Sequence, residues 1–576
     1  MNYSKLFSPF SFEVYENYNS TLIKSSTKNI KDEQAFSFRG GYEISRWIIA
    51  GAAANSKILS DDRNLALNSS SNADASVFLK FSPIADFYIS PYFGYTNKEQ
   101  IGETDNGSLY GIESRLENFQ FSDIRANSSF SFMNEDIMPR RNLSRVFSAS
   151  LESRFDDNIY NTITAGLMHK RNDYYYADSS IYTDYNIAKN IQSRSESRYA
   201  LQNKLRYDEL LDIFSFDVSI QALWRKIDRD ARYKPSRIVE STFDYKVDEF
   251  RLDFETSLSY EGKNAGTVLR FLITENEERY APKKIGDKGL TAYEDRSKRE
   301  FQKNNISERL AISISGSWNI TSKDRIFYNF SQNKYRYDTP AEENYDDRDE
   351  LLSIGRVEYW RKLNRYFEWF VNLEGNVSSL RYIFSERSSN NNIKRILTFS
   401  SGGYYKNSRV ISKNTFTTSA NYTVYDFEKL NPNLLSFSFR QLTINDSSSV
   451  KLSRSLSIRF LGYYKLSEQG NFNWTAFSEK PLRNQTEIYA EPVFVVEWKK
   501  IKYGAGVRFF QILSYLYSGS EKKLNTEYQS IGPLADIQFN SGSLRISITG
   551  WYEFITMNTK SFNETANLNF MVNWGL

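Results

Sequence analysis

The sequence predicts an all-β chain: a transmembrane antiparallel up-and-down β-barrel of about 26 strands, within a range of about 22–28. Three observations predict it: apolar and polar residues alternate along the chain, the alternating segments are long, and aromatic residues make up 16% of the sequence. A period of two residues is that of a β-strand with one apolar and one polar face. The strand number follows because a strand and its connection take about 22 residues, and the chain has 576.

The alternation is clearest in the segments 214–224, 250–260, 310–318 and 544–554. Apolar residues occupy mainly the even positions of these segments, and mostly polar residues lie between them. Many such segments stay extended for about 12 to 16 residues, against about 5–6 in soluble sheets. We find no convincing apolar stripe with the 3.6-residue period of a helix.

Turn-forming residues separate the predicted strands. Tight turns are predicted at 82–86, 155–158, 321–324, 406–408 and 540–542, and longer polar connections at 171–195, 275–305 and 337–350. In the first two-thirds of the chain the short and long connections tend to alternate. One end of the structure is therefore expected to carry short turns and the other long loops, although past about residue 430 the pattern no longer assigns sides.

A sheet of this size with one apolar face must hide both its edges and that face. A closed barrel in a lipid bilayer does both. Phe254 and Ile314 are then expected to face lipid, and Ser315 to face the lumen. The alternative is a soluble all-β protein, such as a propeller or stacked sandwiches. A propeller has short strands and a regular repeat of about 40–50 residues, and no repeated signature motif is found.

Composition excludes several other classes. The chain has no cysteine and a single histidine, which rules out a disulfide framework, a thiolate metal site and covalent haem attachment. The longest near-apolar run, Trp47–Ala54, is far shorter than the ~20 residues of a membrane helix. The net charge of +4 is spread along the chain, so we expect no nucleic-acid partner. No cofactor is expected.

The C-terminal segment supports a membrane barrel. Leu568, Phe570, Val572, Trp574 and Leu576 alternate with mainly polar residues up to the last position. This pattern resembles the terminal strand of large bacterial outer-membrane β-barrel proteins, which carries their assembly signal and usually ends on an aromatic residue. The resemblance is to the class, and it rests on pattern rather than on a specific motif.

The resemblance implies a location in the outer membrane of a Gram-negative (diderm) bacterium, in contact with outer-membrane lipid and lipopolysaccharide. It also implies the barrel-assembly machinery as a partner of the C-terminal strand. In size the chain is similar to the barrels of the lipopolysaccharide-insertion translocon and of the decahaem-cytochrome conduit. Disulfides matter in the former, and this chain has no cysteine with which to form them.

We interpret residues 1–576 as a single barrel domain. The first residues lead straight into the alternation at Phe10 and Phe12 without a signal peptide. We therefore expect an upstream signal peptide or periplasmic domain in a longer precursor. The early start also leaves no room for a globular plug ahead of the first strand.

Barrels of about 16–18 strands leave an aqueous channel, and about 22 strands leave a lumen that needs a plug. We therefore expect a pore or conduit for passage of material across the outer membrane, with the lumen occupied by loops or by a partner protein in the lumen or periplasm. One alternative is a structural sheath or translocon barrel around a partner. Another is an outer-membrane lipid hydrolase, which would have to be built on His169. No nucleophile motif accompanies His169, so we do not expect an enzyme.

Three other segments hold candidate functional residues. The segment 275–305 mixes acids and bases, and the sequence leaves open whether it narrows the pore or lies outside. Gly504 and Gly506 form a lone Gly-x-Gly within a strand pattern, which indicates curvature rather than a phosphate site. An acidic loop supplies oxygen ligands of the kind calcium prefers, without EF-hand spacing, and a solvated loop is the alternative. This candidate metal site comprises Glu342, Glu343, Asp346, Asp347, Asp349 and Glu350.

Overall fold

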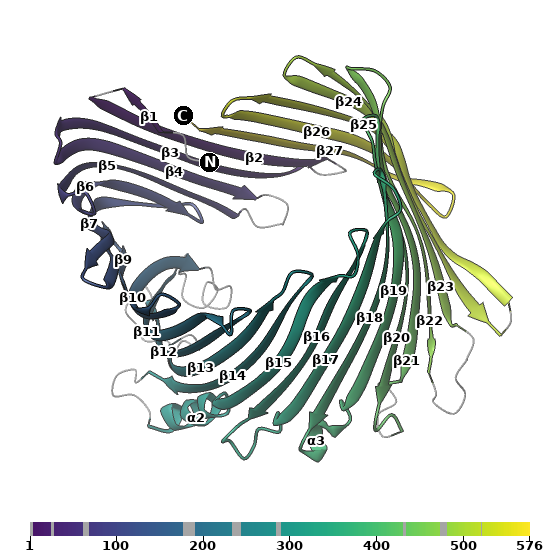
Figure 1. Cartoon of the computed structure of the whole chain (residues 1–576), viewed down its shortest axis with the longest axis horizontal. Helices are drawn as coiled ribbons and strands as arrows, with labels where there is room; N and C mark the ends of the chain where they lie inside the picture. Colours follow the sequence, from purple (N-terminus) through teal and green to yellow (C-terminus); the bar gives the residue numbers. More distant parts are fainter. Residues whose placement is uncertain are drawn as a thin grey trace.

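The computed structural model is a closed antiparallel β-barrel of 26 strands, as the alternation predicts (Figure 1). Each strand pairs with its neighbours in the sequence, and the strands surround one central opening. The structure describes residues 4–7, 9–24, 28–61, 68–176, 190–232, 244–283, 290–429, 434–472, 481–519 and 521–575.

The barrel strands are 14 to 21 residues long. In chain order, the strands are β1 (Ser4–Phe7), β2 (Phe10–Lys24), β3 (Lys28–Ser45), β4 (Ile48–Asp61), β5 (Asn68–Ile84), β6 (Phe87–Gln100), β7 (Glu103–Phe121), β8 (Ile124–Ile137), β9 (Arg140–Asp156), β10 (Ile159–Tyr176), β11 (Asn190–Leu210), β12 (Phe214–Arg232), β13 (Tyr245–Glu261), β14 (Ala265–Pro282), β15 (Asn305–Asn319), β16 (Asp324–Asp338), β17 (Arg348–Lys362), β18 (Phe367–Tyr382), β19 (Asn392–Lys406), β20 (Val410–Tyr425), β21 (Phe437–Lys451), β22 (Leu456–Asn471), β23 (Arg483–Trp498), β24 (Ile501–Ser518), β25 (Glu521–Ser541), β26 (Leu544–Met557) and β27 (Lys560–Gly575).

The barrel closes between its first long strand and its last. Residues 15–24 of β2 pair antiparallel with residues 566–575 of β27. The short strand β1 pairs with residues 10–13 of β2, so it continues the same edge beyond the end of β27. The C-terminal segment is thus a strand that seals the barrel, as its alternation predicts, while Leu576 lies outside the described residues.

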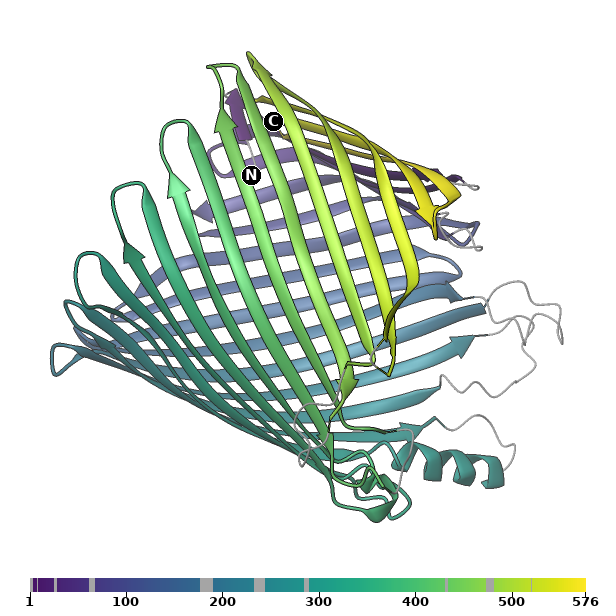
Figure 2. The ribbon, with the colours of Figure 1, turned by 90° about the vertical axis from the view of Figure 1, so that its right-hand side faces the viewer.

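The two ends of the barrel differ in their connections (Figure 2). Twelve connections of two to four residues, from 46–47 to 542–543, lie at one end, here called the short-turn end. The five predicted tight turns all fall there. The opposite, long-loop end carries the longer connections between β10 and β23 together with a few tight turns such as 101–102. Successive connections continue to alternate between the two ends past residue 430, where the sequence alone did not predict the end of each connection.

The outer face carries an apolar band bounded by aromatic pairs. Phe214 of β12 and Tyr260 of β13 lie next to the short turns with ring centroids 5.5 Å apart. Ten residues further along β12, the rings of Trp224 and Phe250 lie 6.0 Å apart. The next outward pair, on the long-loop side, is the ion pair of Lys226 with Asp248 at 3.6 Å. An apolar strand stretch of 9–11 residues between aromatic girdles is what crosses a bilayer.

The predicted facing is confirmed in β15. Leu310, Ile312 and Ile314 alternate as exposed apolar residues on the outer face. Ser315 pairs with Val268 and Asn329 on the opposite, lumen-facing side. In β13, Phe254 pairs with Ile220 on the same outward face as the pair of Trp224 and Phe250.

Among the residues that the structure describes, two helices interrupt the strand pattern: α2 (Leu290–Phe301) and α3 (Ser385–Ser388). The sequence shows no helical stripe for α2 because the helix is short and mostly polar, with too few apolar residues to mark a face. Strand pairing also extends into the predicted loops, since β10 reaches Tyr176 and β14 reaches Pro282. Within the described ranges, neither helix is long and apolar enough to cross a membrane.

Candidate functional site

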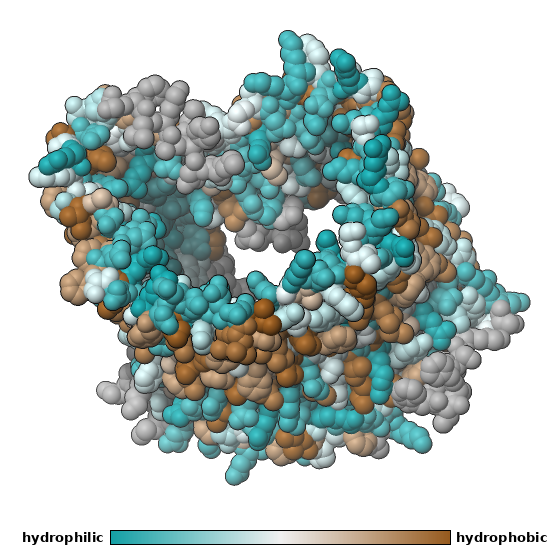
Figure 3. All heavy atoms as spheres, viewed as in Figure 1, coloured by the Kyte–Doolittle hydropathy of each residue, from teal (hydrophilic) through white to brown (hydrophobic). Residues whose placement is uncertain are grey.

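The lumen wall is polar and carries paired charges. Arg225 of β12 donates to Glu196 of β11 at 3.0 Å and to Glu249 of β13 at 2.9 Å. Similar inward pairs recur around the barrel: Arg251–Asp253, Arg270–Glu255, Arg356–Glu358, Lys465–Glu487, Arg459–Asp536 and Arg508–Glu491. Figure 3 shows an opening bordered mostly by hydrophilic residues, while apolar residues gather on the outer wall. Because cations and carboxylates neutralise each other, the lumen has no dominant charge along these strands.

The barrel bends sharply at β6–β8, where the wall has no room for side chains at two glycines of β7. A Cβ on Gly107 would lie 1.7 Å from the carbonyl oxygen of Asp136, and a Cβ on Gly111 would lie 2.2 Å from that of Phe132. The bend brings β6 against β8 across the intervening strand. As a result, the Tyr92 hydroxyl of β6 donates to the Phe132 carbonyl of β8 at 3.4 Å. Glycine in a strand often marks such a close backbone approach.

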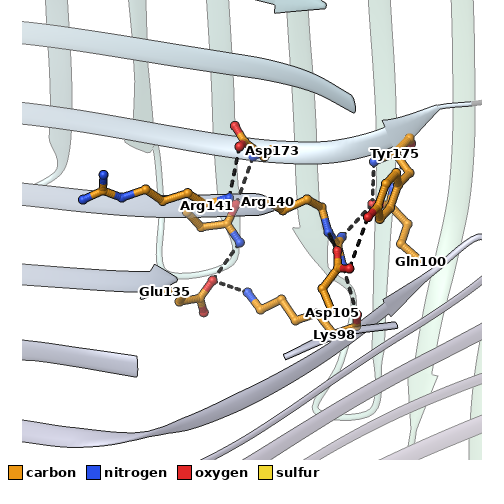
Figure 4. Close-up of polar contacts among 9 residues, drawn as sticks. Lys98, Gln100, Asp105, Glu135, Arg140, Arg141, Asp173 and Tyr175 are labelled. Atoms are coloured by element: carbon orange, nitrogen blue, oxygen red, sulfur yellow. Dashed lines mark hydrogen bonds and ion pairs between the residues drawn. The ribbon is translucent and has the colours of Figure 1, made fainter. Parts of the chain in front are cut away.

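Above this bend, Arg140 of β9 is at the centre of a buried network (Figure 4). Its side chain is 4% exposed and forms an ion pair with Asp105 of β7, which is 7% exposed. Its two terminal nitrogens donate to the Gln100 side chain at 3.0 Å and to the Lys98 carbonyl at 2.9 Å, both on β6. The Tyr175 hydroxyl of β10 donates to Asp105 at 3.2 Å. A buried cation with all three donor nitrogens bonded in this way is a rigid element of the wall.

A second layer continues the network toward β10. Glu135 of β8 accepts from Lys98 of β6 and from Asn142 of β9, the latter at 2.8 Å. The Asn142 side-chain oxygen in turn accepts from the backbone N–H of Asp173 at 3.0 Å. The Asp173 carboxylate accepts from the backbone N–H of Arg141, also at 3.0 Å. Five consecutive strands, β6 to β10, are therefore tied together by side chains in addition to the sheet hydrogen bonds.

A lumen pocket of about 680 Å³ adjoins this network. Its lining runs from the closing strands β27 and β2 through β6, and includes Arg140 at its far side. Its polar lining includes several amide side chains and lysines, and its apolar lining includes Ile58, Leu59 and Met571. The amides are Asn17, Asn19, Gln34, Asn72, Gln100 and Asn573, and the lysines are Lys57 and Lys98. Such a lining offers many donors and acceptors beside a substantial apolar surface.

This network is not predicted by the sequence. The bonded partners that build it lie 7 to 75 residues apart, and none sits in a recognisable motif. The only local signals are the tight turn at 138–139, which places Arg140 at a strand start, and the glycine pair of β7.

The acidic loop does not bring its carboxylates together. Asp347 accepts from the backbone and hydroxyl of Thr339, Asp346 pairs with Arg387 at 3.1 Å, and Glu350 pairs with Arg348 at 2.8 Å. Glu343 accepts from Gln302 at 2.9 Å, whereas Glu342 is exposed. Asp349 and Glu350 belong to β17 rather than to the loop. The described ranges contain no group of three or more acidic or histidine side chains placed to hold a metal ion.

His169 lies on the outward face of β10 near the long-loop end. Its Nδ1 is 2.9 Å from the Ser197 hydroxyl of β11, so the structure does bring a serine to the histidine. On its other side the cross-strand neighbour of His169 is Arg145, a cation. A catalytic Ser-His pair needs a carboxylate that orients the imidazole, and among the described residues no acidic side chain bonds to His169.

In the described part of the segment 275–305, helix α2 lies at the margin of the barrel rather than across the central opening (Figures 1 and 2). Helix α2 packs beside β14, and Arg296 donates to the Asp244 carbonyl at 2.9 Å. Lys283, which precedes the helix, pairs with Asp228 and Asp230. Burial lowers the pKa of Lys283, but these hydrogen bonds outweigh it and raise the pKa above its usual value.

In β24, the Gly-x-Gly follows the predicted structural role. A Cβ on Gly506 would lie 2.2 Å from the Pro492 carbonyl oxygen of β23. The close approach is between strands, so these glycines allow curvature and do not cradle a phosphate.

These features define the class of the protein. A closed 26-strand barrel with an apolar outer band, aromatic pairs at both edges of that band on β12 and β13, and a polar lumen is a large outer-membrane β-barrel. It therefore resides in the outer membrane, with its short turns toward the periplasm and its long loops outside.

No protein-family model matches the chain, and no curated protein matches it. Solved structures with a similar fold include the FrpB iron transporter from Neisseria meningitidis, with 8% identity over 98% of this chain and 81% of that one, and a TM-score of 0.44. The siderophore receptor PirA from Pseudomonas aeruginosa shares 8% identity over 98% of this chain and 80% of that one, with a TM-score of 0.40. FpvA of P. aeruginosa, solved with bound pyoverdine, shares 11% identity over 98% and 72%, with a TM-score of 0.40. Likeness at this level carries no argument about function.

Proposed function

We propose that this barrel is a conduit for hydrated, polar solutes across the outer membrane. The observation that carries the proposal is the opening bordered by hydrophilic residues and paired charges along its wall. A wall of this kind lets water and polar solutes pass while the apolar band holds the barrel in lipid.

The balance of charges supports a conduit of low ionic selectivity. Selectivity by charge needs a ring or patch of one sign facing the pore. Here Glu249, Asp253 and Glu358 each pair with an arginine at 2.9 Å or closer. The amide-rich pocket beside Arg140 then gives the wall a place where a neutral polar solute can bind in passing.

In the cell we propose that a partner protein restricts this conduit. A permanently open lumen of this size would leak, because barrels of about 22 strands already need a plug. Helix α2 lies at the margin of the opening, which favours a partner over this loop as the restricting element. The alternative role is a sheath that holds a partner within the lumen, and it too would fill a lumen that otherwise leaks.

Solute uptake into liposomes tests the conduit. Vesicles containing the folded barrel should take up neutral oligosaccharides and charged dyes of similar size at similar rates. Vesicles with heat-denatured barrel are the control. If folded, inserted barrel admits neither solute, the lumen of the isolated chain is blocked and the conduit proposal is wrong for this form of the protein.

Catalysis is not part of the proposal. Among the described residues, no acidic side chain contacts His169. Its cross-strand neighbours are Ser197 on β11 and Arg145 on β9. We therefore do not propose a lipid hydrolase.

A further inference from the structure

Ten of the twelve connections at the short-turn end separate into an acidic and a basic arc, while the turn 46–47 carries Arg46 and the turn 542–543 is uncharged. From β5 to β12, the four turns 85–86, 122–123, 157–158 and 211–213 each carry one aspartate and no lysine or arginine. We call this the acidic arc, formed by Asp86, Asp123, Asp157 and Asp212.

From β13 to β24, the next six turns carry the opposite charge. They contain seven lysine or arginine residues and no aspartate or glutamate. We call this the basic arc, formed by Lys263, Lys323, Arg365, Arg409, Arg454, Lys499 and Lys500. Because consecutive strands are neighbours around the barrel, each set of turns is a continuous arc of the rim.

The side chains of both arcs are exposed. Asp157 pairs with Arg154 at 2.8 Å, Lys500 donates to the Ser541 hydroxyl, and Arg365 and Lys499 lie over neighbouring aromatic rings. Within the described residues, none of the other charges in the two arcs has an ion-pair partner within 4 Å.

At the adjoining strand ends several charges are paired, as in Arg206 with Asp208 at 2.7 Å and Lys362 with Glu368 at 3.6 Å. Exposed charges remain there too: Asp156 and Glu209 border the acidic arc, Lys406 and Lys451 border the basic arc, and Glu261 lies where the two arcs meet.

Lipid headgroups do not account for two arcs. The aromatic residues Phe214 and Tyr260 place the membrane boundary next to the turns, so the whole rim meets the same lipid. A surrounding that is uniform around the barrel favours one sign of charge all round. Only an object held in a fixed rotation relative to the barrel distinguishes one half of the rim from the other.

We propose that the short-turn rim is the docking surface for a single periplasmic protein whose facing surface is basic toward the acidic arc and acidic toward the basic arc. Complementary charge steers encounter and fixes the relative rotation of two partners. The inference goes beyond the conduit, since the rim can dock a partner whatever the lumen transmits.

Single cysteines allow a direct test because the chain has none. Ala85→Cys lies in a turn of the acidic arc and Ser408→Cys in a turn of the basic arc, and both positions are exposed. Each variant, labelled with a photoreactive maleimide in intact envelopes of the native organism, is crosslinked and the product is identified by mass spectrometry. We expect the same protein from both positions, linked through a lysine- or arginine-rich segment at Ala85 and an aspartate- or glutamate-rich segment at Ser408.

Removing the acidic arc tests whether charge holds the partner. The variant D86N/D123N/D157N/D212N should lower the crosslinking yield at Ser408→Cys about tenfold. A matched control removes four exposed acids at the opposite end, E294Q/D295N/E342Q/E386Q, and should leave the yield unchanged. Heat-modifiable migration on gels verifies that both variants are folded. Raising the salt from ~0.1 M to ~1 M, which shortens the Debye length from about 10 to about 3 Å, should weaken crosslinking of the unmodified rim as well.

Three results would overturn the proposal. The first is crosslinking to lipid alone at both positions. The second is capture of unrelated proteins by the two arcs. The third is a yield that neither the acidic-arc variant nor salt reduces.

Discussion

Arg140 and Asp105 form an ion pair between β9 and β7 in which both side chains are almost completely shielded, at 4% and 7% exposure. The pair sits beside the bend at β6–β8, and it connects strands that are not neighbours in the sheet. A buried charge is tolerated only when its partner is in place. This pair therefore holds the wall beside the lumen pocket in one shape.

Breaking the pair should destabilise the barrel. We expect Arg140→Ala to lower the free energy of unfolding by about 3–5 kcal/mol, because Asp105 is left buried without its cation. Urea titration of the barrel in detergent, followed by tryptophan fluorescence, measures the change. Arg115→Ala on β7, which removes the exposed ion pair of Arg115 with Glu117, is the control and should cost less than about 1 kcal/mol. Equal losses for the two variants would show that the pair carries no special weight.

The two faces of β15 should respond differently to a charge. Ile314→Arg, and likewise Phe254→Arg on β13, should cost about 2–4 kcal/mol or block assembly, because each places a cation in the lipid band. Ser315→Arg faces the lumen and should be tolerated. Heat-modifiable migration on gels reports folding of each variant. The facing assignment fails if Ser315→Arg is as damaging as Ile314→Arg.

The bend at β7 should depend on glycine at one position. Gly107→Val should prevent assembly, since even a Cβ at Gly107 would lie 1.7 Å from the Asp136 carbonyl oxygen. Gly375→Val on β18 is the matched control, because a Cβ there meets nothing within 4 Å. The amount of folded barrel recovered from membranes gives the readout. Normal assembly of Gly107→Val would contradict the close approach of β7 and β8.

Lumen charge should set ion selectivity. The unmodified barrel should show reversal potentials near zero in a salt gradient, because its inward cations and carboxylates are paired. Arg225→Gln leaves Glu249 without its cation and should shift the reversal potential toward cation selectivity. Lys226→Gln makes the same charge change on the outer face and should have no effect. If the reversal potential shifts by a similar amount in both variants, Arg225 does not face the lumen.

The serine beside the histidine should be catalytically silent. Purified barrel should release no fatty acid from phospholipid vesicles, since no acidic side chain among the described residues contacts the imidazole of His169 and Arg145 is its cross-strand neighbour. Fatty-acid release that disappears in Ser197→Ala would instead establish a lipid hydrolase.

The barrel could be predicted from the sequence because the two-residue period of a strand does not depend on which strands lie beside it. The outward row of Phe250, Leu252 and Phe254 is visible in the chain and is found on the outer face. Helix α2 was not predicted because a short, polar helix leaves no apolar stripe. The loop bounds were too wide because strands continue as polar segments above the membrane, where alternation fades.

The buried network around Arg140 could not be predicted from the sequence, for a different reason. Arg140 meets Gln100 and Asp105 only because the wall bends at β7, and neither the bend nor the register can be read from composition. Ser197 likewise meets His169 only through the pairing of β10 with β11. The two arcs of turn charge, by contrast, are present in the sequence, but they become visible only once every turn has been assigned to an end.

Single-channel recording of the purified barrel in a planar bilayer tests the central claim most directly. A conduit with an open, charge-balanced lumen predicts large, stable conductance steps with little preference between cations and anions. Protein that is shown to be folded and inserted, yet gives no conductance, would contradict the claim that the lumen of the isolated chain is an open passage.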